Sequence, residues 1–253
     1  MDSSAGARSG PAPVRHHLQS QGHFPGLARH GLESADTRRQ SLRPRRRSHR
    51  AVAEEDLAAG KRIARRLGAW IVFEDEASHT LVPARSRTWG RRGRTPVVRV
   101  RKRGSGRVSL AGLSAYRPGE RSRFFYRTMP HRKRKGEKNG FRERQFADML
   151  DAAHRALDGP IVLVWDNLNA HKSARMRELI AARPWLRVYQ LPSYAPELNP
   201  VESAWSLLKR RMANTLIEGV DHLLELVRTH LEDIQARTDL IDGFFAGTGL
   251  KPP

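Results

Sequence analysis

The chain has 253 residues, enough for one sizeable domain with additional segments. Its formal charge of +21, from 47 Lys and Arg against 26 Asp and Glu, favours a polyanionic partner. The absence of cysteine excludes disulfides and thiolate metal sites, and no apolar run approaches the roughly 20 residues that span a bilayer. We therefore expect a soluble, cytoplasmic protein with no membrane partner.

The basic residues are concentrated in one block. Residues 91–144 hold 19 Lys and Arg against 3 Asp and Glu, whereas residues 51–90 carry no net charge and residues 145–253 carry −2. Only 8 of the 47 basic residues are Lys, and a GC-rich genome enriches Arg without functional demand. The position of the charge is therefore stronger evidence for an anionic partner than its total.

The first segment, residues 1–52, is rich in Arg, His, Ser, Gly and Pro, and its apolar residues follow neither a helical nor a strand period. We expect it to be a disordered basic segment. Its composition also fits an organellar transit peptide, but the amphipathic period of such peptides is absent. Residues 54–67 then show a helix-like pattern.

Apolar runs and helical periods predict the elements that follow. A buried strand over 69–73 ends at Glu74-Asp75-Glu76, and strands over 108–116 and 122–129 are joined at Pro118-Gly119. The later predicted elements are a helix over 142–157, a strand over 161–165, a helix over 172–182, a strand over 186–191, a loop over 192–200, and helices from 201 and over 221–236. This order predicts an α/β domain over 53–245, with a mixed five-stranded sheet covered by helices on both faces, and a flexible tail over 246–253.

Two of the predicted strands end in an aspartate, Asp75 and Asp166. If these strands are neighbours, both carboxylates lie at one edge of the sheet, where they could hold a hard divalent cation. Taken singly, an aspartate at a strand end is more often a turn or cap residue. The pair in this order is what indicates a metal site.

Glu202 is the best-placed third carboxylate, in the first turn of the predicted helix from 201, with 35 residues between it and Asp166. A purely structural interpretation is also available. Asn199-Pro200-Val-Glu202 is a capping-box pattern, with Asn199 as N-cap, Pro200 at the first helical position and Glu202 bonding back.

These residues resemble those of one family. The sequence has Phe-Glu-Asp75-Glu, then Trp-Asp166-Asn167 with His171 four residues on, and then the block LPSYAPELNPVESAW over 191–205. In this it is similar to the Tc/mariner-like DDE transposases of bacterial insertion sequences, over roughly residues 55–245. The block with Asn-Pro-x-Glu-x-x-Trp is the most specific part of the resemblance.

The resemblance implies a ribonuclease-H-like fold and a DNA transposase that hydrolyses phosphodiesters and transfers strands. It implies that Asp75, Asp166 and Glu202 are the catalytic and metal-binding residues, holding two Mg²⁺ or Mn²⁺ ions that direct water and then a DNA 3′-hydroxyl. The expected partners are transposon-end and target DNA, and the expected active form is a homodimer, associated with the bacterial nucleoid when bound to DNA.

The basic block follows the first metal-binding strand and could track the DNA backbone. We also expect Asn167 and His171 to orient the site or nearby DNA. The candidate DNA-binding residues are Arg91, Arg92, Arg94, Arg99, Arg101, Lys102, Arg103, Asn167 and His171.

The chain departs from the family ahead of the catalytic domain. Complete relatives carry helix-turn-helix modules there, and residues 1–50 show neither the paired amphipathic helices nor the turn. We expect a truncated or split-frame copy that works with a separately encoded DNA-binding half. The alternatives are a catalytically inactive basic DNA-binding remnant and another ribonuclease-H-like nuclease.

Overall fold

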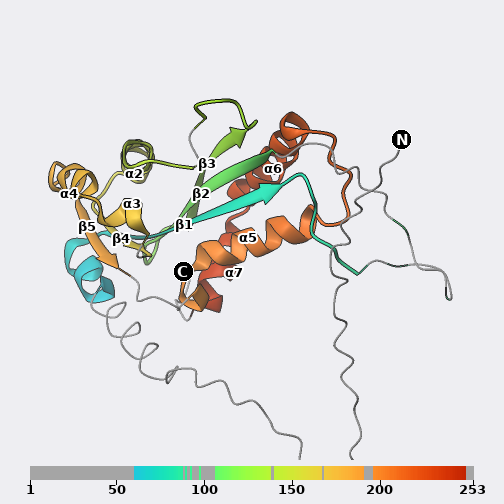
Figure 1. Ribbon diagram of the computed structural model, residues 1–253. Coiled ribbons are helices and arrows are strands. Elements are labelled where there is room, and N and C mark those ends of the chain that lie inside the picture. The colour runs from blue at the N-terminus through green and yellow to red at the C-terminus, as the bar shows by residue number, and fades with distance from the viewer. Residues whose placement is uncertain are drawn as a thin grey trace, which may run out of the picture. The chain divides into compact units, whose positions relative to one another are not determined.

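The computed structural model describes residues 60–87, 89, 92, 97, 106–137, 140–166, 168–190 and 196–248. A five-stranded sheet of order β3-β2-β1-β4-β5 lies at its centre (Figure 1). The strands are β1 (Trp70–Thr80), β2 (Arg107–Tyr116), β3 (Arg123–His131), β4 (Ile161–Trp165) and β5 (Leu186–Gln190). Strands β1 to β3 form an antiparallel meander, and β4 and β5 run parallel to β1, so the predicted mixed sheet is confirmed.

Strand β1 is longer than its apolar run predicts. It pairs with β4 only over Trp70–Phe73, but its antiparallel ladder with β2 continues to Thr80. The prediction that the strand ends at the acidic residues was wrong, because backbone pairing with β2 holds the chain extended after burial of the side chains decreases. Asp75 consequently lies inside the strand, opposite Gly112.

Helices α2 (Glu143–Leu157), α3 (Asn169–Lys172) and α4 (Ala174–Ala181) lie on one side of the sheet (Figure 1). The helix predicted over 172–182 is observed as α4, and Ser173 separates it from the short helix α3, which was not predicted. This residue has extended backbone, and its side chain accepts a hydrogen bond from the Met176 amide as the N-cap of α4.

Helices α5 (Pro200–Arg211), α6 (Val220–Ala236) and α7 (Thr238–Gly247) lie on the other side, and the 3₁₀ turn η2 (Pro196–Leu198) leads into α5. Helix α7 was not predicted, and it includes the start of the expected flexible tail. A further helical stretch over 60–67 precedes β1. No helix within the described ranges is both long and apolar enough to cross a bilayer.

The sheet separates two apolar cores, because successive strand side chains point to opposite faces. On β1, Ile71 and Phe73 pack with the core formed by α5, α6 and α7, while Trp70 and Val72 pack with the core formed by α2 and α4. The same alternation continues into the acidic run. Odd-numbered Asp75 therefore faces the α5 side and even-numbered Glu74 the α2 side.

Candidate active site

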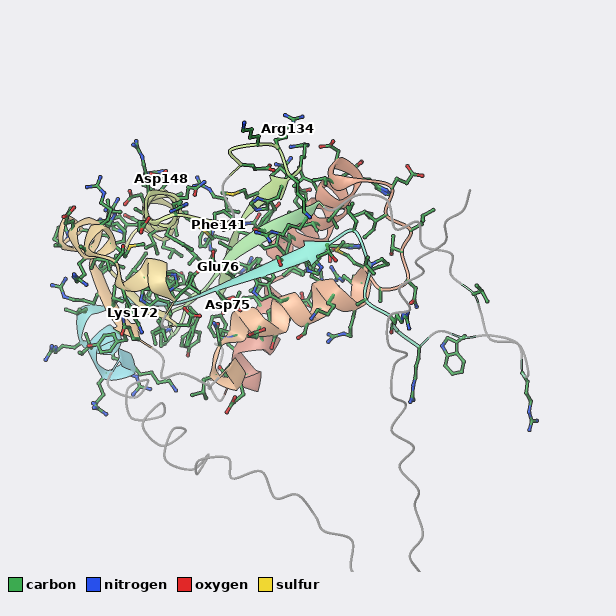
Figure 2. All side chains as sticks on the ribbon, in the orientation of Figure 1. Asp75, Glu76, Arg134, Phe141, Asp148 and Lys172 are labelled. Carbon is green, nitrogen blue, oxygen red and sulfur yellow. The ribbon has the colours of Figure 1, made fainter. Side chains whose placement is uncertain are left out.

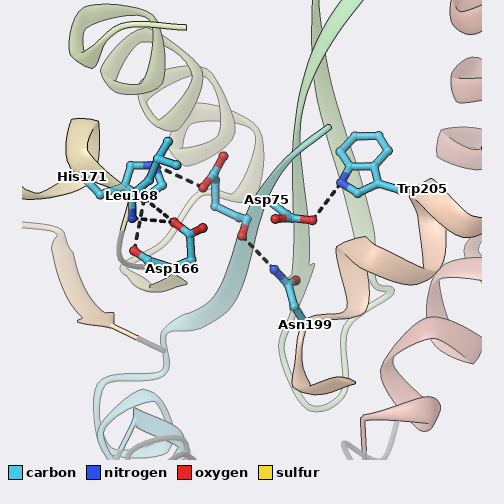
Figure 3. A network of polar contacts seen from close by, with 7 residues as sticks. Asp75, Asp166, Leu168, His171, Asn199 and Trp205 are labelled. Atoms are coloured by element: carbon cyan, nitrogen blue, oxygen red, sulfur yellow. Dashed lines mark hydrogen bonds and ion pairs between the residues drawn. The ribbon is translucent and has the colours of Figure 1, made fainter. Parts of the chain in front are cut away.

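Asp75 is held against helix α5 by an indole. Trp205 Nε1 donates to Asp75 Oδ2 at 3.0 Å (Figure 3). The indole fits there because Gly112, the β2 partner of Asp75, has no side chain: a Cβ at position 112 would lie 2.8 Å from the Trp205 ring. One carboxylate oxygen of Asp75 is thus anchored to the protein.

The environment of Asp75 disfavours its negative charge. Burial is the largest cause, and the charges of Glu202 and Asp166 add to it, raising the pKa of Asp75 to about 7. The hydrogen bonds from the Glu76 backbone and from Trp205 act in the opposite direction. Negative charges after β4 and at the start of α5 therefore act on the Asp75 carboxylate of β1.

Asp166 follows β4 directly and is 55% exposed. Its Oδ1 accepts from the Leu168 amide at 2.9 Å and lies 3.0 Å from His171 Nδ1. The hydrogen bond from His171 is the main reason why the pKa of Asp166 lies below its ordinary value, and the Leu168 amide adds to it. Two carboxylates of one site thus have pKa values displaced in opposite directions.

His171 is buried, with 1% of its side chain exposed. Its ring stacks on Trp165 at a centroid distance of 4.0 Å and an interplanar angle of 3°, and Phe146 meets it edge-on at 5.1 Å. Of the two roles expected for His171, orienting the site is therefore the one that this burial favours over contact with DNA.

Asn199 joins the start of α5 to β1. Its Oδ1 accepts from the Val201 amide as the N-cap, and its Nδ2 donates to the Glu74 carbonyl at 2.9 Å. The return bond of the capping box does not form between the described side chain of Glu202 and Asn199. Glu202 is exposed in the first turn of α5, so the structural interpretation of this residue is not realised.

Two further carboxylates, Glu74 and Glu76, flank Asp75 and were not singled out from the sequence. Burial is the main cause that raises the pKa of Glu74 well above its ordinary range, and burial also raises the pKa of Glu76. Figure 2 shows Asp75 and Glu76 beside each other on β1. The Phe-Glu-Asp-Glu run was the available signal, but only the sheet register assigns each carboxylate to a face.

Most of the predicted DNA-binding residues lie outside the described ranges: Arg91, Arg94, Arg99, Arg101, Lys102, Arg103 and Asn167. Arg92 is described and exposed. Their contacts with DNA stay predictions.

Asp75, Glu76, Asp166 and Glu202, here called the acidic group, fit a hard divalent cation by their chemistry. All its donors are carboxylate oxygens, and among the described residues no lysine or arginine forms an ion pair with Asp75, Glu76 or Glu202. No three acidic or histidine side chains of the described ranges are close enough to enclose an ion as they stand. In the described part of the chain the three expected ligands are therefore not gathered around one point.

A mixed five-stranded sheet with acidic residues on its central strand, after the adjacent parallel strand and at the start of a covering helix defines a ribonuclease-H-like domain. The chain is similar in fold to three solved structures of Mos1 transposase. In a paired-end complex with the left transposon end, the TM-score is 0.57 at 18% identity, covering 88% of this chain and 64% of that one. For a paired-end complex with Mg, the TM-score is 0.55 at 17% identity, covering 88% of this chain and 64% of that one. For the catalytic domain alone, the TM-score is 0.51 at 16% identity, covering 83% of this chain and 90% of that one.

The chain thus spans about two thirds of the length of the paired-end proteins and nearly all of the isolated catalytic domain. None of the curated proteins searched matches it. Residues 70–224, more than half of the chain, match the model of the DDE superfamily endonucleases. The chain belongs to this family of endonucleases, and the predicted ribonuclease-H-like fold is confirmed.

Proposed function

We propose that this chain is the catalytic domain of a Tc/mariner-like DNA transposase, which hydrolyses phosphodiesters and transfers strands during insertion-sequence transposition. The observation that carries the proposal is the match of residues 70–224 to the DDE superfamily endonucleases, in a domain that places Asp75 on β1, Asp166 after β4 and Glu202 at the start of α5. Burial and the negative charges of Glu202 and Asp166 raise the pKa of Asp75, which supports a site built to receive cations.

Asp75, Asp166 and Glu202 are the residues that would hold two Mg²⁺ or Mn²⁺ ions. When bound, such ions activate the attacking oxygen and stabilise the leaving oxygen of a phosphodiester. The chain's own contribution is orientation. Trp205 holds Oδ2 of Asp75, while the Leu168 amide and His171 hold Oδ1 of Asp166, whose other oxygen would be available to an ion. The paired-end Mos1 complex with Mg supports the choice of metal.

The proposed substrate is DNA, at transposon ends and at the target. The basic block over 91–144 supplies the charge for phosphate contacts. A homodimer, a separately encoded DNA-binding half and a location in the bacterial cytoplasm belong to the same proposal. The paired-end complex of Mos1 with a transposon end supports DNA as the partner.

The decisive experiment incubates the full chain with labelled duplex DNA, with and without Mg²⁺ or Mn²⁺, and follows nicking and joining. We expect metal-dependent products that fall about 100-fold or more in Asp75→Asn, Asp166→Asn and Glu202→Gln, because each removes a ligand charge worth several kcal/mol in the transition state. The control is Asp148→Asn, an exposed aspartate on α2, which should keep full activity.

DNA binding without metal-dependent cleavage would replace this proposal with that of an inactive DNA-binding remnant. Cleavage of RNA–DNA hybrids in preference to duplex DNA, without strand joining, would instead indicate another ribonuclease-H-like nuclease.

A further inference from the structure

Residues from two neighbouring strands, Glu74 on β1 and Trp165 on β4, surround His171, and we call this arrangement the His171 clamp. Trp165 is the last residue of β4, Glu74 lies on β1, and His171 lies on α3 after the aspartate that it contacts. Both Glu74 and His171 are essentially inaccessible, with side chains 2% and 1% exposed. His171 therefore belongs to the interior of the domain, although it lies beside a half-exposed carboxylate.

The two nitrogens of His171 face different groups (Figure 3). Nδ1 lies 3.0 Å from Asp166 Oδ1 and 3.2 Å from the Asp166 carbonyl oxygen. Both of these atoms are acceptors, so Nδ1 carries the proton and donates it. Nε2 lies 3.4 Å from Glu74 Oε2, within ion-pair distance but without hydrogen-bond geometry.

This arrangement fixes the orientation of the imidazole. Stacking on Trp165 and the edge of Phe146 hold the ring plane, and Glu74 selects which edge of the ring faces β1. A ring turned by 180° would place carbon atoms where Nδ1 and Nε2 now meet oxygen. The clamp thus leaves one orientation in which Asp166 receives a hydrogen bond.

The His171 clamp contains buried polar atoms that destabilise the folded state. Glu74 Oε1, His171 Nε2 and Trp165 Nε1 are buried without a hydrogen-bond partner among the described residues. A buried polar atom without a hydrogen bond destabilises the folded state, and apolar side chains would fill the same space without that effect. Packing alone does not account for the polar groups of Glu74 and His171, whereas control of Asp166 does.

Resting on the proposed function, we propose that His171, held in place by Glu74 and Trp165, is a positioning residue that fixes the Asp166 carboxylate for metal binding. With Oδ1 occupied by His171 Nδ1 and the Leu168 amide, the rotation of the carboxylate is fixed. No described residue donates to Oδ2, so this is the oxygen presented to the cation.

The test measures Mn²⁺ binding to the full chain by the loss of the free-ion signal in electron paramagnetic resonance, a readout independent of catalysis. His171→Asn keeps a donor near the position of Nδ1, His171→Gln keeps a polar group near Nε2 only, and His171→Phe keeps only the ring. We expect His171→Asn to bind within about 3-fold of the original chain and the other two to bind about 10-fold or more weakly, as for outer-shell partners of metal ligands.

His131→Gln is the matched control, since His131 is also buried but contacts Ser109 Oγ on β2. It should bind Mn²⁺ normally. Thermal melting separates loss of folding from loss of positioning, and His171→Phe should stay folded because it keeps the stack on Trp165.

Equal Mn²⁺ affinity in all three His171 variants would overturn the positioning role, as would an affinity in His171→Asn as low as in His171→Phe. If the original chain itself bound no Mn²⁺ while folded, the metal site of the proposed function would be the part that fails.

Discussion

Trp205 packs so closely on Gly112 that no side chain larger than hydrogen fits at position 112. Gly112→Ala would place a methyl group 2.8 Å from two ring carbons of Trp205 and 3.0 Å from Val201. We expect overpacking to reduce the free energy of unfolding by about 1–3 kcal/mol and to move the indole away from Asp75. Denaturant unfolding measures the first effect, and tryptophan fluorescence reports the second. An alanine variant as stable as the original chain would contradict the close packing.

Asp75 makes the stability of the metal-free chain depend on pH. Its pKa is about 7 in the folded protein against an ordinary value of 3.8, so the folded state binds the proton more tightly. The contribution of Asp75 to the free energy of unfolding is fully present below about pH 4. It is lost as the pH rises to about 7, by on the order of 4 kcal/mol at most. In EDTA, Asp75→Asn should therefore gain stability relative to the original chain between pH 4 and 7.5.

The comparison with Asp75→Asn is needed because other groups titrate in the same range. Burial lowers the pKa of His79 and of His230, and each of these changes makes stability rise with pH. The histidines contribute equally to the stability of both chains, so their contribution disappears from the difference between the two stability curves. Parallel stability curves for the two chains from pH 4 to 7.5 would show that Asp75 does not carry the raised pKa.

Among the helices of more than one turn, α7 is the one that the sequence pattern did not reveal. Its glycines, Gly243 and Gly247, weaken the helical signal, and it begins directly after Arg237 at the end of α6. Its place depends on tertiary packing instead, since Ile241 and Phe245 are buried against the core on the α5 side. Packing of this kind overrides local propensity and is not visible in a short window of sequence.

The helix at α7 leads to a prediction of increased stability. A Cβ at Gly243 would meet no atom within 4 Å. Gly243→Ala should raise the free energy of unfolding by about 0.5–1 kcal/mol, because alanine loses less backbone entropy in a helix. Chemical denaturation measures this change, with Gly112→Ala as a substitution of the same chemistry and opposite sign. A decrease in stability would argue against a helix at this position.

The elements that were predicted depend on local chemistry. The apolar run Ile161–Trp165 and the N-cap Asn199 with Pro200 are determined by neighbours in sequence, and both elements were confirmed. The position of Asp75 inside β1 was missed because it depends on pairing with Gly112 of β2, 37 residues further along the chain. The contact of Glu74 with His171 was also beyond prediction, since only the strand register sends Glu74 and Asp75 to opposite faces.

At the scale of the whole molecule, a cation would link three elements that the chain itself holds together against charge repulsion. Asp75 lies on β1, Asp166 follows β4 and Glu202 lies in the first turn of α5, and after burial the negative charges of Glu202 and Asp166 raise the pKa of Asp75. A bound divalent ion would remove this repulsion in the folded state only. It therefore stabilises the fold by mass action.

We expect 10 mM Mg²⁺ to raise the melting temperature at pH 7.5. For a dissociation constant of about 1 mM the stabilisation is about 1.4 kcal/mol, or roughly 3–6 °C for a domain of this size. NaCl at equal ionic strength controls for simple screening of charge. In Asp75→Asn the Mg²⁺ effect should fall to that of NaCl, because the variant has lost both the repulsion and a ligand. An equal Mg²⁺ shift in the two chains would place the ion elsewhere and would separate the acidic group from metal binding.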